Sequence, residues 1–492
     1  MASLEEIRNI RLAKKALIES KGLSAYPATT NKNIDLKKLR INFEKLVLDE
    51  STHTVAGRIM AIRGQGAIYF ATLYDGTDTF QMVLHAGDTP EPTIQLFGEV
   101  VDIGDFVEFT GKCFTTKKGE PSLLVNGWTM LTKSLLPLPD KWNGLQDDDT
   151  RYRKRYLDIL TNNETREMFL KKAHFWRVMR NFLEEHGFIA VETPVLELTT
   201  GGAETTPFET KHLDYDLDVY LRISVGELWQ KRLMAAGFPK TYEIGRVFRN
   251  EGSSPNHLQE FTNMEFYWAY ADYKMGMTFV RDMYRCIASE VFGTTVFETR
   301  GHKFDMSDEW VEISYVDEIQ KQIQINVLDA TEEELKNKLE SLKIKYDGVT
   351  RERMIDSLWK YCRKNISGPA FVIKYPDFMQ PLAKRSAENS HIVEQFQVLL
   401  GGAELGKGYS ELNDPIDQRE RFEHQQSLTR RGDAEAMMAD YEFVDMLEHG
   451  MPPTCGFGAG ERLFAFLVDK PIREVTLFPL MRPKGNGADH AD

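Results

Sequence analysis

The spacing of apolar residues divides the first part of the chain into a helical start and a strand-rich region. Residues 4–22 carry apolar positions at helical spacing with Lys14 and Lys15 on the polar side, which predicts a basic amphipathic helix. From 51 to 133 the pattern changes to short alternating runs separated by turns such as Asp75-Gly76. About five strands in roughly eighty residues predict a small barrel of the OB type, with an unrelated small β-domain as the alternative.

A proline-containing segment separates this region from a long mixed one. The run Leu136-Pro137-Leu138-Pro139 and the acidic stretch behind it predict a linker over 136–160. Beyond the linker, a helical pattern over 165–187 ends at Gly187 and is followed by an extended run stopped by Pro194. We therefore expect an α+β multidomain protein. Its predicted parts are a basic helical extension (1–50), the barrel (51–135), the linker, a catalytic domain (161–484) with a helical insertion at about 328–366, and a disordered tail (485–492).

Composition narrows the class of protein. Hydrophobic residues make up 42% and charged residues 28%, as in soluble globular proteins, and no apolar run is long enough for a bilayer span. The N-terminus lacks the apolar core of a signal peptide, and the four scattered cysteines show neither a metal-site nor a disulfide pattern, so we predict a cytoplasmic protein. The net charge of −14 argues against non-specific nucleic-acid binding.

Local basic surfaces are still present. Residues 1–40 contain nine Lys or Arg against four Asp or Glu, and a second basic cluster occupies 151–155. Each cluster is either a nucleic-acid contact or simply a solvated face.

The most informative chemistry lies between residues 242 and 267. Arg249 and Glu251 follow an apolar, strand-like run and share a face because side chains alternate along a strand. After a loop that contains His257, a second run places four more residues on one face: Phe261, Asn263, Glu265 and Tyr267. Two neighbouring strands with these groups suit a nucleoside triphosphate beside a small zwitterion.

Three further segments place charged residues next to glycines or at a helix start. The turn at Gly202 has the ordinary alternative of a structural loop, and Glu227 has that of a favourable partner for the helix dipole. In 401–413, where glutamates alternate with glycines, Glu404 is a candidate ligand for Mg²⁺ and Glu411 a candidate partner for a cation. Near the C-terminus, a glycine-rich turn precedes Arg462, which is suited to stack on a purine and pair with phosphate.

In this order the segments resemble the class II aminoacyl-tRNA synthetases, and among them the lysyl-tRNA synthetases. Residues 175–194 resemble motif 1 of that class, 248–273 resemble motif 2, and 456–479 resemble motif 3. The resemblance implies an antiparallel sheet that carries the active site and a homodimer. It also implies an enzyme that uses ATP and Mg²⁺ to attach L-lysine to tRNA(Lys) through a lysyl-adenylate, with no role for DNA or a membrane.

The resemblance also implies residue roles. ATP would be bound by Arg249, Glu251, His257, Phe261, Glu404 and Arg462. Lysine would be bound by Gly202, Glu227, Arg249, Glu265, Tyr267, Lys407, Tyr409 and Glu411. Arg249 and Arg462 would act in catalysis through charge and positioning, without a protein nucleophile. Two buried carboxylates at the far end of the pocket favour a cationic side chain and repel aspartate, which disfavours the aspartyl and asparaginyl branches.

Four positions depart from the pattern of the family. Gln397 stands where a carboxylate metal ligand is usual, beside the other predicted ligand Glu404, and Lys407 stands where an asparagine is usual. Residues 224–227 are one residue longer than usual and 460–462 one residue shorter. Gln397 and Lys407 favour one alternative, a non-catalytic relative that binds RNA or partner proteins, whereas the intact arginines and glutamates favour an enzyme. A protein-lysylating relative is a further alternative, but such proteins lack the barrel.

For the barrel, we predict that it reads the anticodon by stacking bases on exposed aromatic side chains and hydrogen-bonding their edges. The candidates are Arg58, Tyr69, Phe70, Phe80 and Gln81. Strand alternation requires that some of the aromatic residues belong to the core.

Overall fold

The computed structural model describes residues 3–139, 144–203, 205–346, 350–430 and 436–483, and the predicted tail at 485–492 lies outside them. The chain forms two compact units. The first comprises Met1–Arg151 with Tyr156–Thr161, and the second comprises Tyr152–Arg155 with Asn162–Asp492. The predicted linker contains two short helices, α5 (Asp148–Arg153) and α6 (Arg155–Thr161). The predicted α+β fold class is confirmed.

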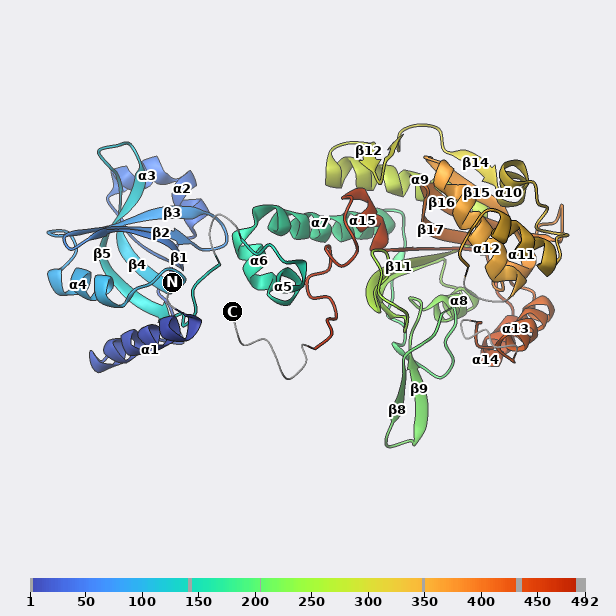
Figure 1. Cartoon of the computed structure of the whole chain (residues 1–492), viewed down its shortest axis with the longest axis horizontal. Coiled ribbons are helices and arrows are strands. Elements are labelled where there is room, and N and C mark those ends of the chain that lie inside the picture. Colours follow the sequence, from blue (N-terminus) through green and yellow to red (C-terminus); the bar gives the residue numbers. More distant parts are fainter. Residues whose placement is uncertain (1–2, 140–143, 204, 347–349, 431–435, 484–492) are drawn as a thin grey trace. The chain divides into compact units, whose positions relative to one another are not determined.

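A closed five-stranded barrel forms the centre of the first unit (Figure 1, blue to cyan). Its strands are β1 (Thr52–Gln65), β2 (Ile68–Tyr74), β3 (Thr79–His85), β4 (Phe106–Thr115) and β5 (Pro121–Thr132). They close in the order β1-β2-β3-β5-β4, and α4 (Glu91–Val100) lies between β3 and β4 in the chain. The predicted OB-type barrel is therefore confirmed.

The helical first fifty residues pack on this barrel. They form α1 (Leu4–Ser20), α2 (Leu36–Ile41) and α3 (Phe43–Asp49). Ile18, Leu39 and Leu46 belong to the same hydrophobic core as the inward-facing residues of the strands. Because helices and barrel share one core, they are parts of one folded body.

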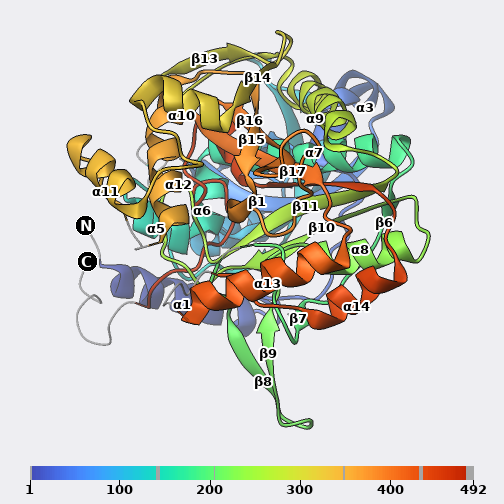
Figure 2. The same cartoon turned by 90° about the vertical axis from the view of Figure 1, so that its right-hand side faces the viewer.

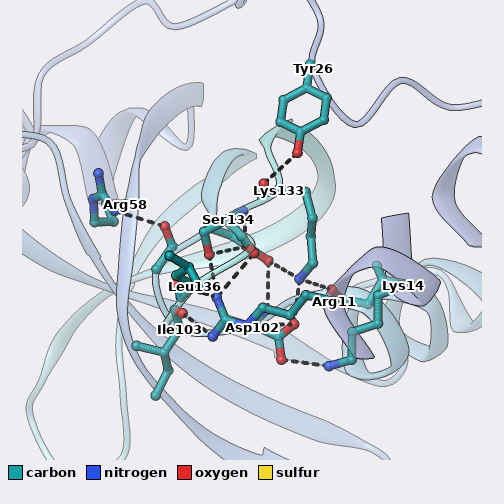
Figure 3. A network of polar contacts seen from close by, with 12 residues as sticks. Arg11, Lys14, Tyr26, Arg58, Asp102, Ile103, Lys133, Ser134 and Leu136 are labelled. Atoms are coloured by element: carbon teal, nitrogen blue, oxygen red, sulfur yellow. Dashed lines mark hydrogen bonds and ion pairs between the residues drawn. The ribbon is translucent and has the colours of Figure 1, made fainter. Parts of the chain in front are cut away.

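Basic residues of α1 fasten it to the barrel through a polar network (Figure 3). The Arg11 guanidinium donates hydrogen bonds to the Ile103, Ser134 and Leu136 carbonyls, and Lys14 Nζ lies 2.6 Å from Asp102 Oδ1. The ammonium of Lys133, which is 1% exposed, lies 2.5 Å from Asp102 and 2.7 Å from Asp105. Arg11 and Lys14, which belong to the predicted basic surface of residues 1–40, thus make contacts within the protein.

The second unit is built on an eight-stranded sheet in the order β14-β15-β16-β17-β18-β11-β10-β6. In that order, the strands are Val311–Ser314, Ala370–Pro376, Ile392–Leu400, Ala403–Ser410, Thr454–Gly460, Glu260–Ala269, Lys240–Phe248 and Ile189–Ala190. All neighbours from β15 to β10 pair antiparallel, and only the two outermost pairs are parallel. The predicted antiparallel sheet is confirmed.

Helices cover the eight-stranded sheet, and a hairpin of a separate small sheet projects from the second unit (Figure 2). The long α7 (Asn163–Glu185) and α9 (Tyr273–Ile287) pack on each other, and both supply residues to the main core. A three-stranded sheet contains the projecting hairpin of β8 (Glu209–His212) and β9 (Leu217–Leu221) beside β7 (Leu196–Glu197), and β12 (Val296–Thr299) pairs with β13 (His302–Asp305).

Among the described residues, seven further α-helices belong to the second unit. They are α8 (Glu227–Ala235), α10 (Tyr315–Ile323), α11 (Glu332–Ser341), α12 (Arg351–Cys362), α13 (Pro415–Arg430), α14 (Tyr441–His449) and α15 (Arg462–Leu467). Within the described residues of the predicted insertion, α11 and α12 are helical and pack into a second hydrophobic core. In the described part of the chain, no helix has the length and apolarity that crossing a membrane requires.

We predict that Lys133→Met destabilises the first unit by about 3–5 kcal/mol, because it leaves the buried Asp105 carboxylate without its counter-ion. The measurement is urea unfolding of the full chain, with amide hydrogen exchange of β4 and β5 to assign the transition to this unit. Lys118→Met, which changes an exposed lysine, is the control. A loss below about 1 kcal/mol for Lys133→Met would contradict the assignment of this pair to the barrel's stability.

Candidate active site

The four central strands of the sheet bring the predicted residues together. β10 and β11 pair antiparallel, as predicted for the run around Arg249 and Glu265, and β18 and β17 continue the sheet beside β11. Every predicted ATP-binding and lysine-binding residue lines one pocket of about 290 Å³, together with Gln397. These residues are spread along the sequence from Gly202 to Arg462, so the sheet order is what assembles them.

A buried charge cluster forms the closed end of the site. Lys231 on α8 lies with Nζ 2.9 Å from Glu227 Oε1 and 2.5 Å from Glu411 Oε2, and all three side chains are buried. The Tyr409 hydroxyl donates a hydrogen bond to Glu227. The Lys231 ammonium also lies 5.5 Å from the centre of the Tyr409 ring. The two carboxylates thus share one ammonium that the protein itself supplies.

Glu265 adds a third buried carboxylate beside this cluster. Its Oε1 accepts hydrogen bonds from Val225 N at 2.8 Å and Asn263 Nδ2 at 3.0 Å, and its Oε2 accepts one from the Tyr267 hydroxyl at 3.1 Å. Burial, and then the Glu227 carboxylate, raise the pKa of Glu265 to about 7. Burial likewise raises the pKa of Glu411 to about 8, although Lys231 opposes the shift. The closed end therefore contains more carboxylates than the Lys231 ammonium can neutralise, and protons take up part of the excess charge near neutral pH.

Cationic and aromatic groups line the more open part of the pocket. The Arg249 guanidinium lies 5.3 Å from the centre of the Phe261 ring and donates from Nε to the Ile223 carbonyl at 3.3 Å. Glu251 accepts a hydrogen bond from the Thr205 hydroxyl. Burial, and then the Arg462 charge, lower the pKa of His257, so its imidazole is neutral at pH 7.

The insertion helix α12 contacts a residue that lines the pocket. Trp359, which is fully buried, donates from Nε1 to Glu404 Oε1 at 2.7 Å, and the Arg363 Nε lies 3.9 Å from Glu404 Oε2. Arg462, at the start of α15, donates to the Glu404 carbonyl oxygen. Glu404 is therefore held through both its side chain and its backbone.

Two glycines are required by close approaches to the carboxylates. A Cβ at Gly202, whose φ is +92°, would lie 2.7 Å from Glu227 Oε2. A Cβ at Gly456 would lie 2.0 Å from Glu411 Oε1. Any larger residue at these positions would push a carboxylate out of place.

Glu227 and Arg462, which end the two segments of unusual length, both line the pocket. Gly226 adopts a left-handed conformation (φ +68°) just before α8, and Glu227 still faces the pocket. In the shorter segment, Glu461 precedes α15 and pairs with Lys172 at 2.7 Å, and Arg462 still lines the pocket.

In the barrel, strand alternation separates the five predicted contact residues into two groups. Arg58, Phe70 and Gln81 alternate with buried residues and lie on the outer face of β1–β3. Phe80 is 1% exposed and belongs to the core, so its prediction as a stacking residue is wrong. Tyr69 packs against the core, with its ring 5.5 Å from that of Phe97.

Sequence reasoning missed two residues that shape the site. Lys231 follows Glu227 by four positions on a helix, a spacing that places both side chains on one face and was a usable signal. Trp359 lies forty-five residues before Glu404 in a segment predicted as an insertion or cap, and no local pattern links the two.

The basic cluster at 151–155 is also engaged within each unit. Arg151 pairs with Asp148 at 3.0 Å and with Asp158 at 3.3 Å. Arg155 is buried in the second unit near Glu474.

The sheet is antiparallel, Arg249 follows β10 directly, and Arg462 follows the glycine-rich β18. This arrangement is that of the class II aminoacyl-tRNA synthetases. The family described as tRNA synthetases class II (D, K and N) matches residues 147–482, and the OB-fold nucleic acid binding domain family matches residues 53–131.

Comparison with curated proteins narrows the class further. The chain is 39% identical to the lysine–tRNA ligase of Thermotoga maritima over 98% of this chain and 97% of the relative. It is 40% identical to that of Moorella thermoacetica, over 97% and 98%, and 40% identical to that of Roseiflexus sp., over 98% and 99%. The chain therefore belongs to the lysine–tRNA ligase family of class II synthetases.

Proposed function

We propose that this protein attaches L-lysine to tRNA(Lys) in two steps. ATP and lysine first form lysyl-adenylate and diphosphate, and the adenylate is then attacked by the terminal ribose hydroxyl of the tRNA, which releases AMP. The observation that carries the proposal is the single pocket in which three buried carboxylates lie at one end and Arg249 and Arg462 line the other part.

Charge balance at the closed end favours lysine. When Glu227, Glu265 and Glu411 are all ionised, the Lys231 ammonium leaves two negative charges in a buried space. Substrate lysine brings two ammonium groups, so it neutralises the cluster, whereas an aspartate side chain would add a further negative charge. In this proposal, Glu227 and Gly202 receive the α-ammonium, and Glu265, Tyr267, Tyr409 and Glu411 surround the side-chain ammonium.

At the nucleotide end, the purine lies between Phe261 and Arg462, Glu251 accepts a hydrogen bond from the adenine amino group, and His257 binds the outer phosphates. Arg249 contacts both the lysine carboxylate and the α-phosphate. It thereby reduces the repulsion between two negatively charged groups as a carboxylate oxygen attacks phosphorus and diphosphate leaves. No side chain forms a covalent intermediate in this scheme.

The donor set fits one magnesium ion that is shared with ATP. Glu404 would supply the carboxylate, and Mg²⁺ in nucleotide sites is commonly held by one or two carboxylates together with phosphates and water. Bound there, the ion would supply charge neutralisation for the phosphates.

The barrel is proposed to read the anticodon on the outer face of β1–β3. Phe70 offers a ring for stacking, Gln81 a side-chain amide, and Arg58 a guanidinium that lies 4.2 Å from the centre of the Phe106 ring.

The assembly is proposed to be a homodimer formed through the motif 1 region. Exposed apolar side chains occur on α7, β6, β7 and their connections: Leu170, Ile189, Val195, Leu196 and Leu198. Exposed apolar surface of this kind is typical of a protein–protein interface. The cytoplasm is the proposed compartment.

The function is tested by exchange of labelled diphosphate into ATP. We expect exchange with lysine and none with aspartate or asparagine, and a loss of at least about 100-fold in kcat/KM for lysine in Glu411→Gln, because breaking a buried charge cluster costs about 3–5 kcal/mol. Glu340→Gln, on the exposed side of α11, is the matched control. Exchange that depends on aspartate, or on no amino acid at all, would overturn the proposal.

Lysine binding should weaken as the pH falls. In the empty pocket, Glu265 and Glu411 have pKa values of about 7 and about 8, so protons occupy them below these values and must leave before the ammonium groups bind. Affinity should therefore increase from about pH 6 to pH 8.5, by up to about tenfold per unit for each carboxyl, with protons released on binding. Calorimetry in buffers of different ionisation enthalpy measures the affinity and the number of protons released. An affinity independent of pH would contradict the proposed role of these carboxylates.

The barrel's role is tested by Phe70→Ala. We expect a loss of about tenfold or more in kcat/KM for tRNA, as for removal of one stacked base, with lysine-dependent diphosphate exchange unchanged. Leu48→Ala removes an exposed apolar side chain from α3 and is the control. Equal losses in both reactions would show that Phe70 supports the fold of the protein instead of contacting tRNA.

A further inference from the structure

Lys407 occupies the mouth of the pocket at a point where two neighbouring strands leave room for a ligand. Lys407 and Tyr409 on β17 and Glu411 just after its end follow one another at every second position, and all three line the pocket. Exposure falls along the series, from the exposed Lys407 to Tyr409 at 9% and Glu411 at 1%. The Lys407 ammonium lies 5.7 Å from the centre of the Tyr409 ring. The strand therefore presents an ammonium where the substrate enters and a carboxylate where it ends.

The cross-strand partners of Lys407 are uncharged. On β16 the partner is Gln397, and on β18 it is Gly458, which has no side chain. Lys407 also lines a second cavity, of about 320 Å³, which shares Gly202, Arg249 and Tyr409 with the first. Lys407 and Arg249 thus border the same space, the one in which Arg249 is proposed to hold the α-phosphate and the carboxylate.

Few side chains beside Lys407 offer oxygen ligands for a divalent cation. Across the described residues, no group of three or more His, Cys, Asp or Glu side chains is arranged to hold a metal ion. Glu404 is the carboxylate of the proposed magnesium site, and its Oε1 already accepts the Trp359 indole N–H. Gln397 contributes only a neutral amide, and it lies directly opposite Lys407 in the ladder. The donor set suits one ion that also binds phosphate, but not a second one.

The charge of Lys407 acts in the same direction. A divalent ion held by Gln397 would experience repulsion from an ammonium on the neighbouring strand, because like charges a few ångströms apart destabilise each other in a partly desolvated site. The ammonium of lysine is itself a compact point charge that binds phosphate well. Lys407 therefore disfavours a second metal ion, and its own positive charge is able to neutralise phosphate in place of that ion.

We propose that Lys407 binds the ATP phosphates beside Gln397 in place of a second divalent cation, so that lysine activation uses only the magnesium ion shared by ATP and Glu404. This inference rests on the proposed function, since it assigns a phosphate contact in the same pocket. It makes Lys407 a nucleotide-binding residue of the activation step.

The first test counts metal ions. Manganese binding to the full-length protein, measured by electron paramagnetic resonance with saturating lysine and a non-hydrolysable ATP analogue, should give one bound Mn²⁺ per chain. The double variant Gln397→Glu with Lys407→Asn restores a carboxylate and removes the ammonium, and it should bind additional Mn²⁺. Two equally tight Mn²⁺ ions per chain in the unaltered protein would overturn the inference.

The second test measures ATP affinity without metal. With EDTA present, Lys407→Met should weaken binding of the ATP analogue by about tenfold or more, as expected for loss of a charged phosphate contact, and Lys407→Arg should retain most of the affinity. Lys336→Met on α11 is the control for a lost surface lysine. A change below about twofold in Lys407→Met overturns the inference, as does a variant whose only defect is a raised KM for lysine, which would assign Lys407 to the amino acid.

The two proposals fail separately. If the unaltered protein lacks lysine-dependent diphosphate exchange, the proposed function is wrong whatever the metal count. If exchange is present but the manganese count or the ATP affinity contradicts the expectation, only the role of Lys407 is wrong.

Discussion

The pairing of one buried ammonium, Lys231, with the carboxylates of Glu227 and Glu411 is the constraint around which the second unit is organised. Charges removed from water destabilise a fold by several kcal/mol unless they are paired at close range. α8, which packs on β10 and β11, must therefore bring Lys231 to Glu411 just after β17, and the backbone at Gly202 and Gly456 must lack side chains so that the carboxylates fit. In the proposed function the same carboxylates receive the ammonium groups of the substrate, so stability and specificity would rest on one set of contacts.

The opposite end of the pocket is organised by neutral and cationic donors. Trp359 fixes the Glu404 carboxylate, Arg462 holds the backbone of the same residue, and Arg249 lies over Phe261. Because Trp359 comes from α12, the segment that resembled an accessory insertion supports the part of the pocket that contains Glu404. A change in the packing of α12 would thus alter the position of Glu404, although the sequence of α12 contains no motif that would indicate this role.

Much of the fold and of the pocket was predictable because local pattern carries the information. Side-chain alternation along β10 and β11 is sufficient to place Arg249, Glu265 and Tyr267 on one side of the sheet, and the short strand runs of 51–133 indicate the barrel. The wrong prediction and one missed residue both depended on tertiary contacts. Alternation alone does not say which face of β3 is the inner one, so Phe80 was placed outside, and the contact between Trp359 and Glu404 joins segments with no common period.

Gly226 illustrates how such a site tolerates a change in chain length. The additional residue before Glu227 is taken up by one left-handed turn at the start of α8, and a Cβ there would lie 2.1 Å from the Thr193 hydroxyl oxygen. Only glycine can occupy that position without moving its neighbours. The feature that matters chemically at this point is the final location of a carboxylate, and a left-handed glycine allows a segment of this length to reach it. A search by fixed spacing would overlook relatives that carry the same pocket on a longer or shorter loop.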